Sequence, residues 1–528
     1  MFAKRVLIFV KSIFENGKVS NILLFIGGSV SILWAVYFAR VTVSIPYQLE
    51  FREGASQVMT SLMLSGENPF VFKNQPFGLN NYGLGYSAAV LPFAALFGNT
   101  LRVHRMVTFV FIVLSALIGF WAVYKIRRNI SLGLTCGAFV MIGLMGRGGI
   151  GAFPSAMGVF LFLMAVLIPF LRSFDYTGLV LSVFFSVAAF YTKAYFVLAF
   201  GIVASYLFLF VSKKRWMIYT LLFLGLIVVS FAVIRFSFPL YFINTVAGNI
   251  SNTYRTSEHL YSQLAQLFYY FYPVLILAAI VLVTGFIKTK RELSTRNAAG
   301  NFINYLIWDH PVVDIPLNYY FYSFLCAFFV FVFVLGSHVG SYLTYAYQLV
   351  LPVFFIWLFQ NLGLGKLPGI FFVPLVLFNL FYWENSTLNS QFLAQGNSRE
   401  WSKLYSYLGS GTNILNSPTI TSRMVELGIT PLDSGQTIYY YFMTPYLDSS
   451  LIGPSYEEFY NNGMEYTRFI NDSIKTQKFD LIVTTKDMDA FYDLDLIAEY
   501  YHLTKQIILY MPQADQKWVA QIWYPVER

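Results

Sequence analysis

Residues 153–212 read FPSAMGVFLFLMAVLIPFLRSFDYTGLVLSVFFSVAAFYTKAYFVLAFGIVASYLFLFVS, and this stretch decides the class of the fold. It holds only three charged side chains, Arg172, Asp175 and Lys193, which separate three apolar runs. A helix of about 20 apolar residues crosses a bilayer. The stretch therefore predicts three consecutive membrane helices, with Lys193 in the very short turn between the second and the third.

The rest of the chain extends this pattern. Of the 528 residues, 57% are hydrophobic and 12% are charged, which excludes a soluble enzyme and a disordered chain. The two cysteines, Cys136 and Cys326, lie in apolar runs and cannot form a disulfide framework or a zinc site. The sequence predicts a polytopic α-helical membrane protein with eleven spans. The expected spans are 21–40, 104–124, 130–146, 153–172, 176–192, 194–212, 216–236, 267–287, 318–337, 343–361 and 366–383.

The charge distribution divides the chain after Trp383, where the apolar runs stop. Residues 1–383 carry 25 Lys and Arg against 9 Asp and Glu, whereas residues 384–528 carry 10 against 17. The net charge of +9 thus averages a basic membrane part and an acidic tail, and we expect no nucleic-acid partner. We predict a transmembrane domain over residues 1–383 and a soluble α/β domain over residues 384–528.

Orientation follows from the positive-inside rule. With a cytoplasmic N-terminus, 16 of the 25 basic residues of the membrane part fall on the inner side. Eleven spans then place the acidic tail outside the cytoplasmic membrane. No cleavable signal peptide is expected, because the basic start leads into a full-length span without a small-residue cleavage site.

The first outer loop, residues 45–105, is the longest outer connection before the seventh span. A helix is expected from Glu53 to Leu64, followed by two Pro-Phe breaks. The apolar segment Tyr86–Gly98 is too short to span, and we interpret it as an interfacial or re-entrant helix. If it did span, every later segment would change sides.

This orientation leaves few acids and many cations on the outer side. Four acids of the membrane part face out, and three of them, Glu50, Glu53 and Glu67, share the first loop; the fourth is Glu258. Cations that converge on one face suit a bound phosphate or pyrophosphate. The alternative for each is snorkelling to the lipid headgroups. The outer cations are Arg40, Arg52, Lys73, Arg102, Arg105, Arg147, Lys193, Arg235 and Arg255.

The first loop also carries an ordered series of motifs. These are Glu53-Gly54, Leu64-Ser65-Gly66-Glu67-Asn68-Pro69-Phe70, Tyr82-Gly83-Leu84-Gly85-Tyr86, Phe97-Gly98 and Arg105. Two later pieces are Tyr191-Thr192-Lys193 and the pair Gly336–Gly340 and Tyr347–Pro352. In this order they resemble the GT-C glycosyltransferases, the membrane enzymes that use polyprenyl-phosphate sugars. Protein O-mannosyltransferases and lipid A aminoarabinose transferases belong to that group.

The resemblance implies an inverting sugar transfer from a polyprenyl-phosphate donor to a glycan, lipid or protein acceptor on the outer face of the membrane. It implies a first-loop glutamate as general base and cations as ligands of the leaving phosphate. The expected base is Glu53, or Glu50 in its place, because Arg52 interrupts the adjacent acids that many members have. The donor-binding candidates are Lys193, Arg147, Arg105, Arg255, His338 and Tyr82. No protein metal site is expected, and a divalent-metal requirement stays open.

Each assignment has a simpler alternative. Glu53 can be an acid that the dipole favours at a helix N-terminus, Glu50 can merely pair with Arg52, and Lys193 can snorkel.

At the level of function, the rival is a transporter or flippase of envelope precursors, which predicts charged residues in the middle of spans. A third possibility is a non-catalytic subunit of polysaccharide assembly, for which loss of the outer glutamates would be harmless.

The acidic tail shows strand and helix patterns but no nucleotide loop or metal cluster. Strands are expected at 413–415, 479–485, 506–511 and 518–523, and helices at 417–428 and 465–475. We expect this domain to help select the acceptor.

Overall fold

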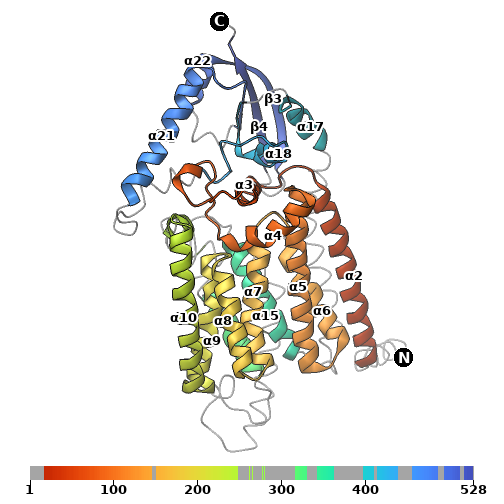
Figure 1. Ribbon diagram of the computed structural model, residues 1–528. Helices are drawn as coiled ribbons and strands as arrows, with labels where there is room; N and C mark the ends of the chain where they lie inside the picture. Colours follow the sequence, from red (N-terminus) through yellow and green to blue (C-terminus); the bar gives the residue numbers. More distant parts are fainter. Residues whose placement is uncertain are drawn as a thin grey trace, which may run out of the picture.

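The computed structural model describes residues 17–145, 150–247, 316–329, 342–361, 397–409, 413–437, 455–485, 493–511 and 516–526, together with residues 261, 265, 276 and 279. Two parts are stacked: a bundle of long apolar helices and a smaller domain with a β-sheet at one end of it (Figure 1). The first loop lies between them. The predicted fold class is therefore confirmed in outline.

The bundle consists of helices at nearly every span predicted within the described residues. Within the described residues, four helical segments are long and apolar enough to cross a membrane: Lys18–Ser44, Leu101–Arg127, Ala194–Val211 and Lys213–Ser237. The helices are α2 (Gly17–Ser44), α5 (Leu101–Arg127), α6 (Ile130–Met145), α7 (Ser155–Leu171), α8 (Tyr176–Phe190), α9 (Leu198–Tyr206), α10 (Lys213–Ser237), α14 (Pro316–Phe329) and α15 (Tyr342–Asn361). The predicted span 366–383 lies outside the described residues, as does 267–287 apart from residues 276 and 279. The count of eleven stays a prediction.

Apolar side chains of the long helices form one large core in the bundle. Small residues let the helices approach closely: a Cβ on Gly137 of α6 would lie 3.0 Å from the carbonyl oxygen of Ala116 in α5. The segment predicted as the span 194–212 is not one regular helix. It begins as the 3₁₀ turn η3 (Ala194–Val197), continues as α9 and ends in the π-helical turn η4 (Leu207–Val211).

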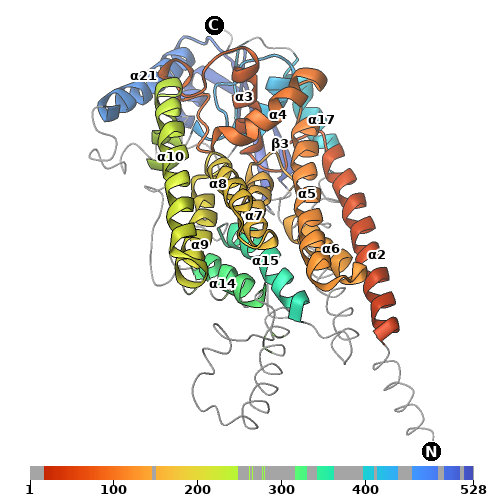
Figure 2. The same cartoon turned by 60° about the horizontal axis from the view of Figure 1, so that its bottom comes forward.

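The first loop forms a layer across one end of the bundle (Figures 1 and 2). Helix α3 (Glu53–Leu64) has the predicted bounds. The 3₁₀ turn η1 (Phe72–Asn74) and helix α4 (Leu84–Phe97) follow. Helix α4 has only 14 residues and lies across the ends of the longer helices, as the interpretation of Tyr86–Gly98 required.

The C-terminal domain is built on a four-stranded sheet of order β1-β2-β4-β3. Strand β1 (Ile414–Leu415) is parallel to β2 (Leu481–Thr485), and β4 (Gln516–Pro525) is antiparallel to both β2 and β3 (Tyr501–Met511). Strands β3 and β4 are longer than predicted. The helical elements are α17 (Ser398–Tyr407), η7 (Pro418–Ile420), α18 (Thr421–Glu426), α21 (Ser455–Lys475) and α22 (Leu494–Tyr500).

The two faces of this sheet have different partners. One face packs on apolar residues of α21 and α22. The other face packs on α17, α18 and three alternate residues of the first loop, Ile45, Tyr47 and Leu49, which are all nearly fully buried. The start of the first loop is thus part of the core of the C-terminal domain. The predicted boundary at residue 384 lies outside the described residues.

Candidate active site

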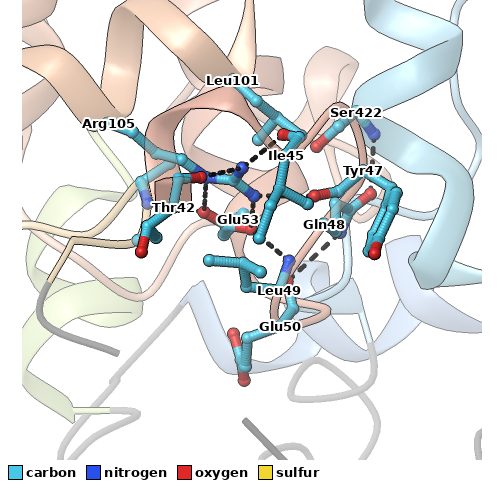
Figure 3. Close-up of polar contacts among 12 residues, drawn as sticks. Thr42, Ile45, Tyr47, Gln48, Leu49, Glu50, Glu53, Leu101, Arg105 and Ser422 are labelled. Atoms are coloured by element: carbon cyan, nitrogen blue, oxygen red, sulfur yellow. Dashed lines mark hydrogen bonds and ion pairs between the residues drawn. The ribbon is translucent and has the colours of Figure 1, made fainter. Parts of the chain in front are cut away.

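Two glutamates of the first loop, three residues apart, occupy different environments. The chain leaves α2 at Ser44, crosses beneath the C-terminal domain as an irregular segment with bends and a turn, and enters α3 at Glu53. Figure 3 shows that Glu53 points toward Arg105, whereas the side chain of Glu50 points away from that pair.

Glu53 forms a fully buried ion pair with Arg105 of helix α5. Its Oε2 lies 2.7 Å from Nη2 of Arg105, and both side chains are 0% exposed. The two carboxylate oxygens accept four hydrogen bonds, two from Arg105 and one each from the backbone N–H groups of Leu49 and Ala152. This carboxylate joins the first loop, α5 and the segment before α7.

Arg105 has no N–H group left for a phosphate. Besides its bonds to Glu53, the guanidinium donates to the backbone carbonyls of Thr42, Ile45 and Tyr47, at 3.3, 2.7 and 2.8 Å (Figure 3). All five donors of the planar fork are therefore used within the protein. Arg105 fastens the end of α2 to α5 in this structure, and its predicted role as a donor ligand stays a prediction.

Glu50 belongs to a second group of polar residues. Its carboxylate pairs with the guanidinium of Arg52, and its Oε2 accepts from the backbone N–H of Arg52 at 2.8 Å. The residue is 7% exposed. Burial raises the pKa of Glu50 above its ordinary value, although the charge of Arg52 acts in the opposite direction. A carboxyl with a raised pKa is a better proton acceptor than an ordinary surface glutamate.

Arg52 connects Glu50 to Tyr82, whose ring in turn contacts Lys193. Its Nη1 donates to the Tyr82 hydroxyl at 3.4 Å. The Nζ of Lys193 lies 4.5 Å from the centre of the Tyr82 ring and donates to Oγ of Ser155 at 2.9 Å. We call Glu50, Arg52, Tyr82, Lys193 and Ser155 the polar cluster.

The snorkelling interpretation of Lys193 is not supported. The residue is 5% exposed, and its amine contacts Ser155 and the Tyr82 ring. The turn that carries it is fixed by the first loop, because the N–H groups of Gly83 and Gly85 donate to the carbonyls of Thr192 and Tyr191. A Cβ on Gly83 would lie 1.9 Å from the Tyr191 oxygen, so only glycine permits this approach.

Aromatic rings surround the cations of the cluster. The Arg52 guanidinium carbon lies 5.4 Å from the ring centre of Phe51 and 6.0 Å from that of Phe153. Lys193 lies 5.9 Å from the ring centre of Tyr195. Such faces attract cations and also offer apolar surface to a sugar or a lipid chain.

The remaining candidates fall in two groups. Arg147, Arg255 and His338 lie outside the described residues, so their predicted roles stay predictions. Glu67, another acid of the first loop, forms an exposed ion pair with Lys73, and the hydrogen bond from Lys73 lowers the pKa of Glu67. Within the described part of the chain, no group of three or more His, Cys, Asp or Glu side chains could hold a metal ion.

Sequence reasoning missed two members of the polar cluster. Arg52 was counted among the outer cations but not selected, because its neighbour Glu50 offered a simple ion pair. Ser155 gave no signal, since a serine at the start of an apolar helix is an ordinary residue. Only the contact with Lys193, 38 positions later, identifies it.

Comparisons with known proteins identify the fold. No family model matches the sequence, and no curated protein matches it. Two solved structures do: ArnT from Cupriavidus metallidurans bound to undecaprenyl phosphate, and the same protein in the apo state. Each is 12% identical to this chain with a TM-score of 0.50, and the match covers 94% of this chain and 97% of the other. The predicted resemblance to the lipid A aminoarabinose transferase type is thus confirmed as a likeness of fold.

Proposed function

We propose that the chain is a membrane glycosyltransferase that moves a sugar from a polyprenyl-phosphate donor to an acceptor on the outer face of the cytoplasmic membrane. The observation that carries the proposal is the polar cluster: a buried carboxylate with a raised pKa lies in one connected set of contacts with two buried or half-buried cations. The cluster lies between the apolar bundle and the C-terminal domain, where a lipid donor and a polar acceptor can meet.

Arg52 and Lys193 suit the donor phosphate. Arginine pairs with phosphate oxygens through its planar fork and lysine as a point charge. Lys193 also contacts the first residue of α7, where the helix dipole is positive. A cation at a helix N-terminus is electrostatically unfavourable on its own. An anion bound by both Lys193 and the N-terminus of α7 removes this repulsion.

Glu50 suits the role of general base. In the proposed step, the acceptor hydroxyl oxygen forms a bond to the anomeric carbon while the bond from that carbon to the phosphate oxygen breaks. The electron pair of the broken bond stays on the polyprenyl phosphate, and the hydroxyl proton passes to Glu50. A direct attack of this kind inverts the anomeric centre.

Donor binding would also prepare the base. In the structure Arg52 pairs with Glu50, and its charge opposes the rise in pKa that burial causes. A bound phosphate gives Arg52 a second anionic partner and weakens its hold on Glu50. The carboxyl then becomes more basic as the phosphate arrives.

Glu53 and Arg105 receive a structural role in this proposal. The pair fixes the end of α2, the start of α3 and the segment before α7, from which Glu50, Arg52 and Ser155 extend. A base with four hydrogen bonds and no exposure has no access to an acceptor hydroxyl. We therefore assign the proton transfer to Glu50, the second of the two glutamates that the sequence offered.

The test is mass spectrometry of envelope glycans, glycolipids and glycoproteins from cells that lack the protein. We expect one glycan or glycolipid to disappear, to return with the natural chain and with Glu67→Gln, and to stay absent with Glu50→Gln. Glu67 is the matched control, because it is an exposed acid of the same loop. A Glu50→Gln chain that restores the product would refute the assignment of the base, and an unaltered envelope would refute the transferase proposal.

A further inference from the structure

The C-terminal domain contacts two of the four sequence segments that build the polar cluster, the one that carries Glu50 and Arg52 and the one before Tyr82. We propose that it positions the catalytic groups, and that Gln48 is the positioning residue through which it holds the backbone of Glu50–Arg52. The inference rests on the proposed function, since it names a residue that acts through Glu50. It gives the domain a role beyond acceptor selection.

Gln48 is a fully buried amide with partners in both parts of the chain. Its Nε2 donates to the carbonyl of Phe51 at 3.0 Å and to that of Pro418 at 3.1 Å, and lies 3.4 Å from the carbonyl of Glu50. Its Oε1 accepts from the backbone N–H of Ser422 at 2.9 Å, as Figure 3 also shows. Gln48 is 0% exposed.

These partners determine how the amide is oriented. Carbonyl oxygens surround Nε2, and a backbone N–H faces Oε1. If the amide were reversed, Oε1 would face three carbonyl oxygens, and the N–H groups of Nε2 would face the N–H of Ser422. The side chain therefore links the peptide groups of Glu50 and Phe51 to the turn at Pro418 and the start of α18 in one defined geometry.

A turn of the C-terminal domain supports the same segment from a second direction. Gly435 has a φ of +91°, and its N–H donates to Oδ1 of Asp433 at 2.7 Å. A Cβ on Gly435 would lie 2.4 Å from the carbonyl oxygen of Phe51. The glycine thus lets the turn touch the backbone between Glu50 and Arg52.

The same turn reaches the segment before Tyr82. Oγ of Ser434 donates to the carbonyl of Leu79 at 2.9 Å, and Oε1 of Gln436 accepts from the backbone N–H of Asn81 at 2.6 Å. All of these groups are buried. One turn of the C-terminal domain therefore contacts both the Glu50–Arg52 segment and the Tyr82 segment, which meet in the polar cluster.

Aromatic packing fixes the approach of the two parts. Tyr47 stacks on Trp401 with ring centres 4.8 Å apart and an interplanar angle of 4°. Phe51 stacks on Trp518 of β4 at 6.4 Å. With these rings in place, the amide of Gln48 is the polar link nearest in sequence to Glu50, two residues away.

The test compares Gln48→Met with Gln57→Met. Gln57 is also a fully buried glutamine, on α3, but its Nε2 donates to the carbonyl of Asn99 at 3.2 Å, a residue of the first loop and not of the C-terminal domain. We expect Gln48→Met to lower kcat by about tenfold or more, the scale of a small misplacement of a catalytic group. Donor KM should stay within about threefold, and the acid limb of the pH–kcat profile should move. Gln57→Met should keep the natural kcat and profile.

Two further measurements distinguish a failure of this inference from a failure of the proposed function. Gln48→Asn, which retains the amide on a shorter side chain, should fold and show the same loss of kcat to a smaller degree. Hydrogen exchange in the peptide that carries residues 49–56 should accelerate in Gln48→Met and not in Gln57→Met. If the exchange accelerates but the natural chain transfers no sugar, the proposed function fails and the contact stands. Natural exchange and natural kcat in both Gln48 variants would overturn the inference.

Discussion

Glu50 and Glu53 differ in what surrounds them, and residue type alone does not reveal the difference. Both lie in an acidic stretch that the sequence identified as the source of a base. The partner of Glu53 is Arg105, 52 positions later, and a further donor is Ala152, 99 positions later. No local pattern encodes those contacts. The acid-Gly motif indicated Glu53 as the base. The complete burial of Glu53 and its four hydrogen bonds favour Glu50 for that role instead.

The first prediction separates the two acids. Glu50→Gln should lower turnover by about 10²-fold or more, the scale of general base catalysis, with the protein folded and donor binding retained. Glu53→Gln should instead lower stability, because it leaves Arg105 as a buried charge without its ion partner. Breaking a buried pair costs about 3–5 kcal/mol.

Initial rates and thermal midpoints in detergent measure these effects. A Glu53→Gln protein with natural stability and no turnover, beside an active Glu50→Gln protein, would return the base role to Glu53. Normal transfer by both single variants and by the double variant would remove this loop from the chemistry.

The second prediction concerns pH. Burial raises the pKa of Glu50, whereas the charge of Arg52 acts to lower that same pKa. The carboxyl must be ionised to accept a proton, so kcat/KM should fall as the pH drops through that pKa, above the range of an ordinary glutamate of about 4.3. Arg52→Gln removes the charge that favours the ionised form, and the acid limb should move to still higher pH.

The profile of kcat/KM against pH for the two proteins measures this shift. Lys73→Gln is the control, because Lys73 is an exposed cation of the same loop whose partner is Glu67. An acid limb that stays in place in Arg52→Gln, or moves to lower pH, would show that Glu50 is not the group that titrates.

Among the elements, the apolar runs predicted the long helices well and the short or irregular ones poorly. Hydropathy places α5 and α10 within a few residues because each is a continuous apolar run. It did not indicate the 3₁₀ and π turns at the two ends of α9, since these depend on hydrogen bonding and not on composition. Helices α17 and α22 were missed because short amphipathic segments give a weak periodic signal.

The third prediction tests the contact that places Tyr82 beside Lys193. Gly83→Ala should push the first loop away from the Tyr191–Lys193 turn, because the added methyl group overlaps the Tyr191 carbonyl. We expect kcat/KM for the donor to fall about tenfold to 10²-fold. Gly201→Ala in α9 is the matched control, since a Cβ there meets nothing within 4 Å.

Steady-state kinetics of the two alanine variants measure this change in kcat/KM. Equal kcat/KM in Gly83→Ala and Gly201→Ala would mean that the backbone contact between Gly83 and the Tyr191–Lys193 turn does not set the geometry of the cluster.

For the whole molecule, composition and charge predicted two parts but not how they join. The division into a basic apolar part and an acidic tail is visible in the sequence. That Ile45, Tyr47 and Leu49 complete the core of the C-terminal domain is not, because their partners lie more than 350 residues later. The described end of α2 near the N-terminus and the C-terminal domain lie at opposite ends of the bundle (Figure 1).

The fourth prediction is the orientation in the membrane. The positive-inside count places the N-terminus inside and the C-terminal domain outside. A phosphatase reporter fused after Arg528 should be active, and a cytoplasm-dependent fluorescent reporter at the same place should be dark. The reverse pattern would place the polar cluster on the cytoplasmic side and exclude an outer-face transferase.

The central claim is that Arg52 and Lys193 bind a lipid phosphate beside Glu50, and native mass spectrometry of the purified protein with undecaprenyl phosphate tests it most directly. We predict one bound lipid per chain, with affinity reduced about tenfold or more in Lys193→Ala, the loss of one charge-assisted hydrogen bond. Affinity should stay unchanged in Lys73→Ala, and it should not fall in Glu50→Gln, because that change removes the anion that competes with the phosphate for Arg52. Equal binding by the natural chain, Lys193→Ala and Lys73→Ala, or no binding by any of them, would contradict the account.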